Sequence, residues 1–192
     1  DSNKFNGCTF QTPSDIITDE NLENISSIIF LNTTGDILNS LQQEVMEDFI
    51  ADGKGFVGIH SATDTEYDWE WYGGLVGAYF KNHPIGTAKA IINTINREHM
   101  STRHLEKDWE IRDEWYNFYN INPNINVLLN LDESSYRGGQ HGDSHPITWF
   151  HEYDGGRSFY TGLGHLSDIY SDTRFINLLK GGILYASGEL NY

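Results

Sequence analysis

Residues 25–59, ISSIIFLNTTGDILNSLQQEVMEDFIADGKGFVGI, decide the fold of this chain. They contain two short runs of β-branched and aromatic residues, at 25–32 and 55–59, which are typical of buried parallel strands. The segment between the two runs is amphipathic and long enough for one helix. A strand–helix–strand crossover is almost always right-handed and builds a parallel sheet with helices on its faces. The stretch therefore predicts an α/β fold.

The predicted crossover helix has a start signal and an apolar face. Asn39 is followed three residues later by Gln42, which is the pattern of a capping box. Leu41, Val45 and Phe49 follow at helical spacing and predict the buried side of this helix.

The remaining elements are shorter and less regular. A helix at 69–80, strands at 86–95, 126–131, 146–153 and 157–163, and a final helix at 173–186 are predicted. The turn at 154–156, Asp-Gly-Gly, makes the last two strands an antiparallel hairpin. The polar region 97–124 is interpreted as an insertion over one end of the sheet, outside the core. In the final helix we expect these side chains to face inward: Phe175, Leu178, Leu179, Ile183 and Leu184.

Residues 1–192 are interpreted as a single domain, because no internal repeat, low-complexity tract or linker divides them. A sheet of this kind normally opens with an apolar strand, but the first residues offer only GCTFQT at 7–12. Either the chain has been trimmed at its start, or a first strand is supplied from elsewhere.

The composition excludes several classes of function. A net charge of −16 repels the phosphates of nucleic acids and anionic membrane surfaces. No apolar run approaches the roughly 20 residues that span a bilayer, so membrane insertion is not expected. The single cysteine, Cys8, rules out an intramolecular disulfide and a multi-cysteine metal site. It also lies far in sequence from the candidate histidines, which argues against a thiolate nucleophile. Periplasmic, secreted and cytoplasmic locations stay open.

Three histidines are predicted at strand ends, where ligands bind in α/β sheets. His60 ends the strand FVGI, His165 follows the strand SFYTGLG, and His145 begins the strand PITW. Each could instead serve only to bond a backbone carbonyl at the end of its strand. For His60 and His165 a functional role is the favoured interpretation, whereas His145 is more readily a structural residue.

Carboxylates accompany these histidines. Asp64 and Glu66 follow His60 in a loop, where they could complete a metal site or act as acid and base. A solvated acidic loop explains them equally well in so acidic a chain. Glu114 precedes Trp115 and Tyr116, a carboxylate beside stacking rings as in sugar sites, although the rings could simply anchor the segment.

Several runs of the chain resemble the ThuA-like (trehalose utilisation) family. They are FLNTTGDILN, GFVGIHSATDTEYDWEWYGGLVGAYFKNHP, DEWYNF, LDESSY, HPITWFHEYDGGRSFYTGLGH and GGILYASG, which cover most of residues 20–188 in order. The resemblance implies a flavodoxin-like fold of the class I glutamine amidotransferase type, a parallel sheet with helices on both faces. Family members usually begin with a strand and a loop bearing an Arg-His pair. This sequence lacks that first strand and helix, which puts the completeness of the pocket in question.

The resemblance also bears on function. In amidotransferases the turn after the equivalent strand carries a nucleophilic cysteine, and here His60 stands at that turn, while His165 matches a later histidine. Glutamine hydrolysis is therefore not expected. ThuA-like proteins are associated with sugar metabolism, and some appear as glycosyl hydrolases. The sequence thus predicts a carbohydrate-processing enzyme, a hydrolase or isomerase that acts on a glycoside or keto-glycoside.

Two chemical routes fit this prediction. A divalent metal ion, held by His60, His165 and His145 or by histidines with a carboxylate, could polarise a ketone or activate water. Alternatively Asp64, Glu66 or Glu114 could act as acid and base, with imidazole as the base beside a ketone. The expected partner is a small carbohydrate, and a homo-oligomer is compatible with the sequence. A non-catalytic sugar-binding or interaction domain on the same fold is the rival interpretation.

Overall fold

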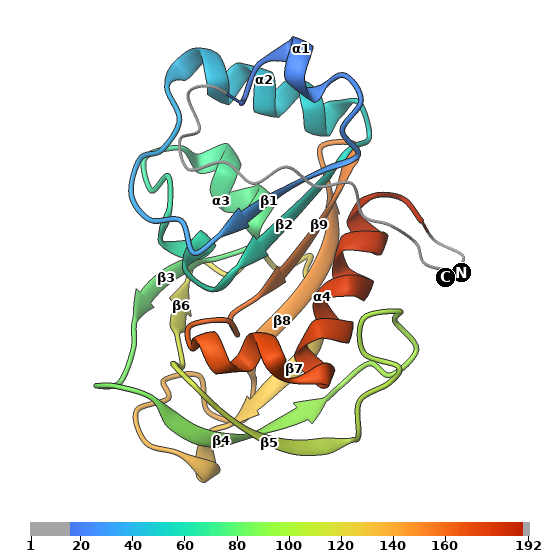
Figure 1. Cartoon of the computed structure of the whole chain (residues 1–192). Helices are drawn as coiled ribbons and strands as arrows, with labels where there is room; N and C mark the ends of the chain where they lie inside the picture. Colours follow the sequence, from blue (N-terminus) through green and yellow to red (C-terminus); the bar gives the residue numbers. More distant parts are fainter. Residues whose placement is uncertain (1–15, 190–192) are drawn as a thin grey trace.

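The computed structural model of the chain describes residues 16–189, which form a mixed α/β fold around a curled seven-stranded sheet (Figure 1). The weak run at 7–12, with Cys8, lies outside the described residues. In spatial order the strands of the sheet are β1 (Ser27–Leu31), β2 (Gly55–Ile59), β9 (Gly156–Thr161), β8 (His145–Tyr153), β7 (Asn126–Asp132), β4 (Ala88–Thr94) and β5 (Asp108–Asp113). A second sheet pairs β3 (Tyr79–Asn82) with β6 (Asn117–Tyr119).

The sheet is parallel in only one of its halves. β1, β2 and β9 pair in parallel, as predicted for the two strands of the crossover, and β8 and β9 form the predicted antiparallel hairpin. The prediction of a parallel sheet with only this hairpin antiparallel was wrong for the other half, where β4, β5, β7 and β8 are antiparallel. The reason is the connections: β4–β5 and β7–β8 are joined by loops without a crossover helix, and such loops reverse the chain direction.

Four α-helices accompany the sheet: α1 (Asp19–Leu22), α2 (Ser40–Ala51), α3 (Glu70–Val76) and α4 (Thr173–Ala186). Short 3₁₀ turns follow strands β2, β7 and β9, namely η2 (His60–Asp64), η3 (Glu133–Ser135) and η4 (Ser167–Ser171). Figure 1 shows α4 running alongside β9. No helix in the described part of the chain is both long and apolar enough to cross a membrane.

Helix α2 confirms its predicted start and part of its predicted face, since Phe49 is buried and Val45 packs against the core. Asn39 and Gln42 form the capping box, with each side chain bonded to the other residue's backbone. Leu41, however, is 73% exposed, and Met46 and Ile50 are fully buried instead. At about 100° per residue Leu41 lies roughly 140° round the helix from Met46, so both cannot face the sheet. The final helix α4 has the predicted bounds, and Phe175 is fully buried.

The region 97–124 is part of the core, contrary to the prediction of an insertion. It contains β5, an edge strand of the main sheet, and β6. Trp109, Trp115 and Phe118 are buried. The error has a physical cause, since β5 buries only alternate residues and its other side chains are charged and exposed. Such an edge strand reads as polar in sequence. This strand matters because it delivers the carboxylates of the candidate site.

Candidate functional site

The site begins at the turn that follows β2, where the backbone conformation is unusual. His60 is the first residue of η2 and has a φ of 51°, in the left-handed region that side chains other than glycine rarely adopt. The Tyr160 hydroxyl donates a hydrogen bond of 2.7 Å to the His60 carbonyl oxygen and holds the turn. A strained residue at the carboxyl end of a central strand is typical of functional sites.

His60, Glu114 and His165 converge from three strands. His60 Nε2 lies 3.4 Å from Glu114 Oε2, His165 Nδ1 lies 3.4 Å from the same oxygen, and the two nitrogens are 3.3 Å apart. His60 follows β2, Glu114 follows β5, and His165 follows β9. We call these three residues the donor triangle. The structure therefore brings together three of the residues predicted from the sequence.

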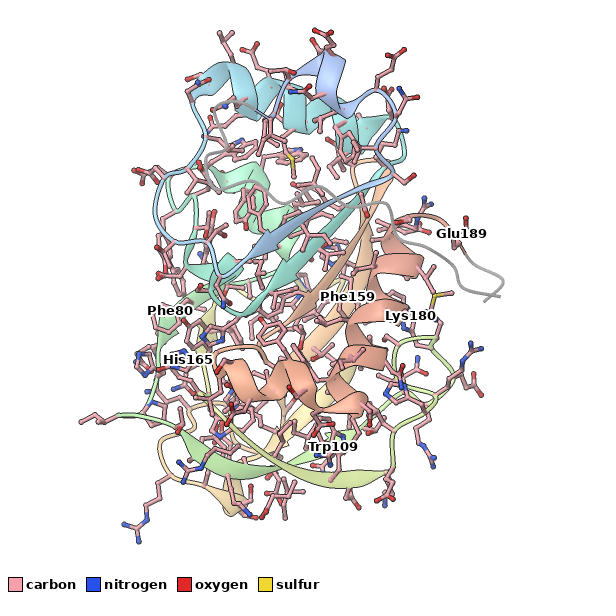
Figure 2. The ribbon with its side chains drawn as sticks, in the orientation of Figure 1. Phe80, Trp109, Phe159, His165, Lys180 and Glu189 are labelled. Atoms are coloured by element: carbon pink, nitrogen blue, oxygen red, sulfur yellow. The ribbon has the colours of Figure 1, made fainter. Side chains whose placement is uncertain are left out.

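The donor triangle is buried on one side and open on the other. The side chains of His60 and Glu114 are 3% and 9% exposed, whereas that of His165 is 42% exposed. Figure 2 places His165 on the same side of the molecule as Phe80. A ligand can therefore reach the triangle from the side on which His165 lies.

The protonation of His60 is fixed by its second nitrogen. His60 Nδ1 lies 2.9 Å from the carbonyl oxygen of Gly162, so Nδ1 carries the hydrogen and donates it. Burial lowers the pKa of His60, against the opposing effects of the Gly162 bond, Asp113 and Glu114, which keeps the ring neutral near pH 7. Nε2 consequently presents a lone pair to the triangle.

Asp113 holds the loop that carries His165. Its carboxylate accepts hydrogen bonds from the backbone N–H of Gly164 at 2.7 Å and of Leu166 at 3.1 Å, the residues on either side of His165. Asp113 is fully buried. Burial raises the pKa of its carboxyl, an effect that the backbone N–H groups oppose. Asp113 was not predicted from the sequence. The only indication of its role there was its position beside Glu114 at the end of a strand.

His83 was also missed. Its Nδ1 lies 3.2 Å from Glu114 Oε1, the oxygen that faces away from the triangle, and 2.7 Å from the Pro84 carbonyl oxygen. The His83 side chain is 37% exposed. The run KNHP, at the end of a stretch that resembles the family, was the one signal for it.

Aromatic rings continue the site away from the triangle. The Tyr116 ring lies 4.3 Å from the His60 ring, and the Phe80 ring lies 4.2 Å from Tyr116. Beyond Phe80, the rings of Tyr67 and Tyr119 are nearly parallel, 6.5 Å apart, and 37% and 40% exposed. The Tyr67 hydroxyl donates to the Phe80 carbonyl oxygen at 3.1 Å, which links the Tyr67–Tyr119 pair to the rings beside His60.

The two loop carboxylates lie outside the donor triangle. Asp64 accepts a hydrogen bond of 2.6 Å from the Tyr67 hydroxyl, beside the aromatic rings. Glu66 is buried and turned toward α2: its Oε1 accepts from the backbone N–H of Ile37 and of Leu38, both at 2.7 Å. Gln43 Nε2 donates to the other oxygen at 2.9 Å. The carboxylate of Glu66 therefore anchors the loop before α2.

His145 belongs to a different cluster. Its Nε2 lies 2.8 Å from the Tyr116 carbonyl oxygen, and its Nδ1 lies 2.8 Å from Glu133 Oε1. The Tyr136 hydroxyl lies 3.1 Å from the same Nδ1. Both ring nitrogens are thus engaged by protein groups, and the structure does not bring His145 to the triangle. Its place is behind Tyr116, whose backbone it holds.

Comparison with known proteins gives the following relatives. The family model described as "ThuA: Trehalose utilisation" matches residues 1–186. A ThuA-like protein from Bacteroides uniformis has a similar structure, with a TM-score of 0.78, 23% identity, and coverage of 92% of this chain and 75% of that one. A ThuA-like protein from Parabacteroides merdae is also similar, with a TM-score of 0.72 and 16% identity, and the match covers 95% of this chain and 77% of that one.

More distant structures share the fold within larger proteins. A β-galactosidase from Bacillus circulans sp. alkalophilus matches with a TM-score of 0.60 and 14% identity over 87% of this chain but only 23% of its own. No functionally curated protein matches. At these identities the solved structures establish the fold alone. Because the family model matches nearly the whole sequence, this chain belongs to the ThuA, or trehalose utilisation, family.

Proposed function

We propose that this chain is a carbohydrate-processing enzyme that acts on a glycoside or keto-glycoside at the donor triangle. The observation that carries the proposal is the convergence of His60, Glu114 and His165 within hydrogen-bonding distance at one solvent-facing point. Convergent ionisable groups at strand ends, supported by buried hydrogen bonds, are the usual construction of an active site in an α/β protein. The family's association with trehalose utilisation supports a sugar as the substrate.

The aromatic rings beside the triangle suit a sugar. The apolar face of a pyranose ring packs well on aromatic side chains, and its hydroxyls bond to nearby carboxylates. Tyr67 and Tyr119 offer exposed, nearly parallel rings, and Asp64 lies beside them. A disaccharide bound with one ring at the triangle would extend its second ring toward these tyrosines.

Two routes of catalysis fit the geometry. In the first, His60 Nε2 uses its lone pair to remove the C–H proton beside a sugar ketone, and the electron pair moves onto the carbonyl oxygen. In the second, the donor triangle would hold a divalent cation, which would supply Lewis-acid polarisation of that carbonyl or of a water molecule. The first route requires His60, the second requires His60 and His165, and neither needs a cysteine nucleophile.

The test is turnover of a sugar panel by the parent chain and by a His60→Ala, His165→Ala double variant. The panel contains trehalose, other disaccharides and their keto derivatives, and products are separated by chromatography. We expect turnover of at least one substrate by the parent and none by the double variant. A His104→Ala variant is the control, because His104 is exposed and bonds the carbonyl of Arg174. Undiminished turnover by the double variant would refute the proposal.

A non-catalytic sugar-binding module is the second candidate, favoured by the exposed rings of Tyr67 and Tyr119. On this alternative the parent binds a sugar without converting it. A Tyr67→Ala, Tyr119→Ala variant loses binding in calorimetry, while the His60→Ala, His165→Ala variant keeps it. Turnover by the parent would exclude the module.

We also infer that the parallel strands form a flavodoxin-like core with helices on both faces. Phe56 of β2 packs on Tyr72 of α3, with ring centroids 5.7 Å apart. Phe159 of β9 is aligned with Val57, the neighbour of Phe56, so its side chain points to the opposite face. There it contacts α4, where a Cβ on Gly182 would meet the Phe159 ring at 2.4 Å. This arrangement supports one helix on each face.

A further inference from the structure

The geometry points to a tetrahedral divalent-cation site of the zinc type at the donor triangle, with His60 Nε2, His165 Nδ1 and Glu114 Oε2 as its three protein ligands. This inference deepens the proposed function, since it assigns a cofactor to the same site. It replaces His145 of the sequence-based ligand set with Glu114.

The separations of the donor atoms match tetrahedral coordination. The three atoms lie 3.3, 3.4 and 3.4 Å from one another, which is nearly an equilateral triangle. Ligands at about 2.0–2.1 Å in a tetrahedron stand roughly 3.4 Å apart. In an octahedral site with bonds of about 2.1 Å, adjacent ligands stand roughly 3.0 Å apart. The observed triangle therefore fits the tetrahedral ion without rearrangement.

The chemical types of the donors agree with the geometry. Two imidazole nitrogens and one carboxylate oxygen form a ligand set typical of catalytic zinc, whereas calcium and magnesium prefer oxygen ligands throughout. Catalytic zinc sites keep three protein ligands and leave the fourth position to water or substrate. Here the fourth position faces the open side of the site, where His165 and His83 are exposed.

Each ligand is held from behind, as in preorganised metal sites. His60 donates Nδ1–H to the Gly162 carbonyl, which leaves Nε2 as the coordinating atom. Glu114 Oε1 lies 3.2 Å from His83 Nδ1, which leaves Oε2 as the oxygen that would bind the ion. Asp113 fixes the backbone on both sides of His165 through its bonds to Gly164 and Leu166.

Metal binding is tested on the full chain by calorimetry with Zn²⁺ after treatment with a chelator. We expect a single ion per chain with high affinity. His165→Ala and Glu114→Gln should each weaken binding by more than the roughly 10- to 100-fold loss that follows when a residue merely supporting a ligand is changed. His165 is partly exposed, so its removal leaves the core packing intact. Circular dichroism verifies that both variants fold.

A matched control and a spectroscopic measurement keep the test specific. His141→Asn alters the separate cluster around His145 and Glu133, and we expect it to bind Zn²⁺ as the parent does. Substitution with Co²⁺ should give the intense visible absorption of a tetrahedral ion, and that absorption should vanish in His165→Ala. No Zn²⁺ binding by the parent, parent-like affinity in Glu114→Gln, or a weak octahedral Co²⁺ spectrum would overturn the inference.

The two proposals fail separately. Sugar turnover by a chain that binds no Zn²⁺ would overturn the cation site and leave the proposed function standing through the imidazole route. Tight Zn²⁺ binding by all three ligands without turnover of any sugar would support the cation site and count against the proposed function.

Discussion

Glu66 offers the sharpest test of how this fold uses its acidic residues. It is only 2% exposed, and its Oε1 accepts two backbone hydrogen bonds, from Ile37 and Leu38. We predict that Glu66→Ala strongly destabilises the chain, because the buried N–H of Leu38 and the partly buried N–H of Ile37 lose their acceptor. We predict that Glu66→Gln is much milder. The Gln amide oxygen can replace Oε1, and the amide of Gln43 can rotate to present its oxygen to the new NH₂ group.

The magnitudes follow from the hydrogen bonds. Leaving a buried donor unsatisfied costs about 1–3 kcal/mol, so Glu66→Ala should lower the free energy of unfolding by about 4 kcal/mol. Glu66→Gln keeps the hydrogen bonds but removes the negative charge of their acceptor, so the free energy of unfolding should fall by about 1–2 kcal/mol. For a domain of this size about 2–4 °C of melting temperature corresponds to 1 kcal/mol. The alanine variant should therefore melt roughly 8–16 °C below the parent.

Urea unfolding followed by tryptophan fluorescence measures these differences, since the chain contains five Trp. Asp68→Asn is the control, because Asp68 is an exposed acid of the same loop and its replacement should change stability by less than about 0.5 kcal/mol. We also expect Glu66→Gln to retain Zn²⁺ affinity. An alanine variant within 1 kcal/mol of the parent, or a glutamine variant as unstable as alanine, would refute the anchoring role.

Three further predictions follow from single features. Asp113→Asn keeps one good acceptor for the loop of His165, and we expect Zn²⁺ affinity, measured by chelator competition, to fall about 10- to 100-fold. Gly55→Ala places a Cβ 2.1 Å from the Ala186 carbonyl oxygen, and thermal unfolding should show a loss of about 1–3 kcal/mol in the free energy of unfolding. Burial lowers the pKa of His99 to about 4, so the unfolded chain binds its proton first as pH falls. The free energy of unfolding should therefore be highest above pH 6.5 and decline by about 2–3 kcal/mol as the pH falls toward 4. In the His99→Gln variant this decline should be smaller.

Much of the parallel half of the fold was predictable from the sequence. The run GFVGI is uninterrupted and apolar because β2 is buried along its whole length, and Asn39 with Gln42 shows where α2 begins. His60 and His165 were predicted as a pair because both follow strands of this half. They lie close together because β2 and β9 are parallel neighbours, whose carboxyl ends share one edge of the sheet.

The antiparallel half was harder to predict for a physical reason. An edge strand such as β5 packs only one side on the core, so its sequence DWEIRD carries more charge than apolar surface. Asp113 was therefore not recognised as a buried residue, and Glu114 was proposed as an acid or base only because of its aromatic neighbours, without a link to the histidines. Glu66 was interpreted wrongly for the opposite reason. A buried carboxylate that accepts hydrogen bonds from backbone N–H groups cannot be distinguished in the sequence from an exposed, reactive acid.

The order of the strands has a consequence for how the protein is made. β2 and β5 precede β7, β8 and β9 in the chain, yet these three later strands lie between them in the sheet. During translation His60 and Glu114 thus emerge from the ribosome well before they can meet, because their meeting waits for the hairpin that carries His165. Contacts between such distant segments form late in folding. Nascent chains that stall before this hairpin should therefore hold no partial site and capture no ion.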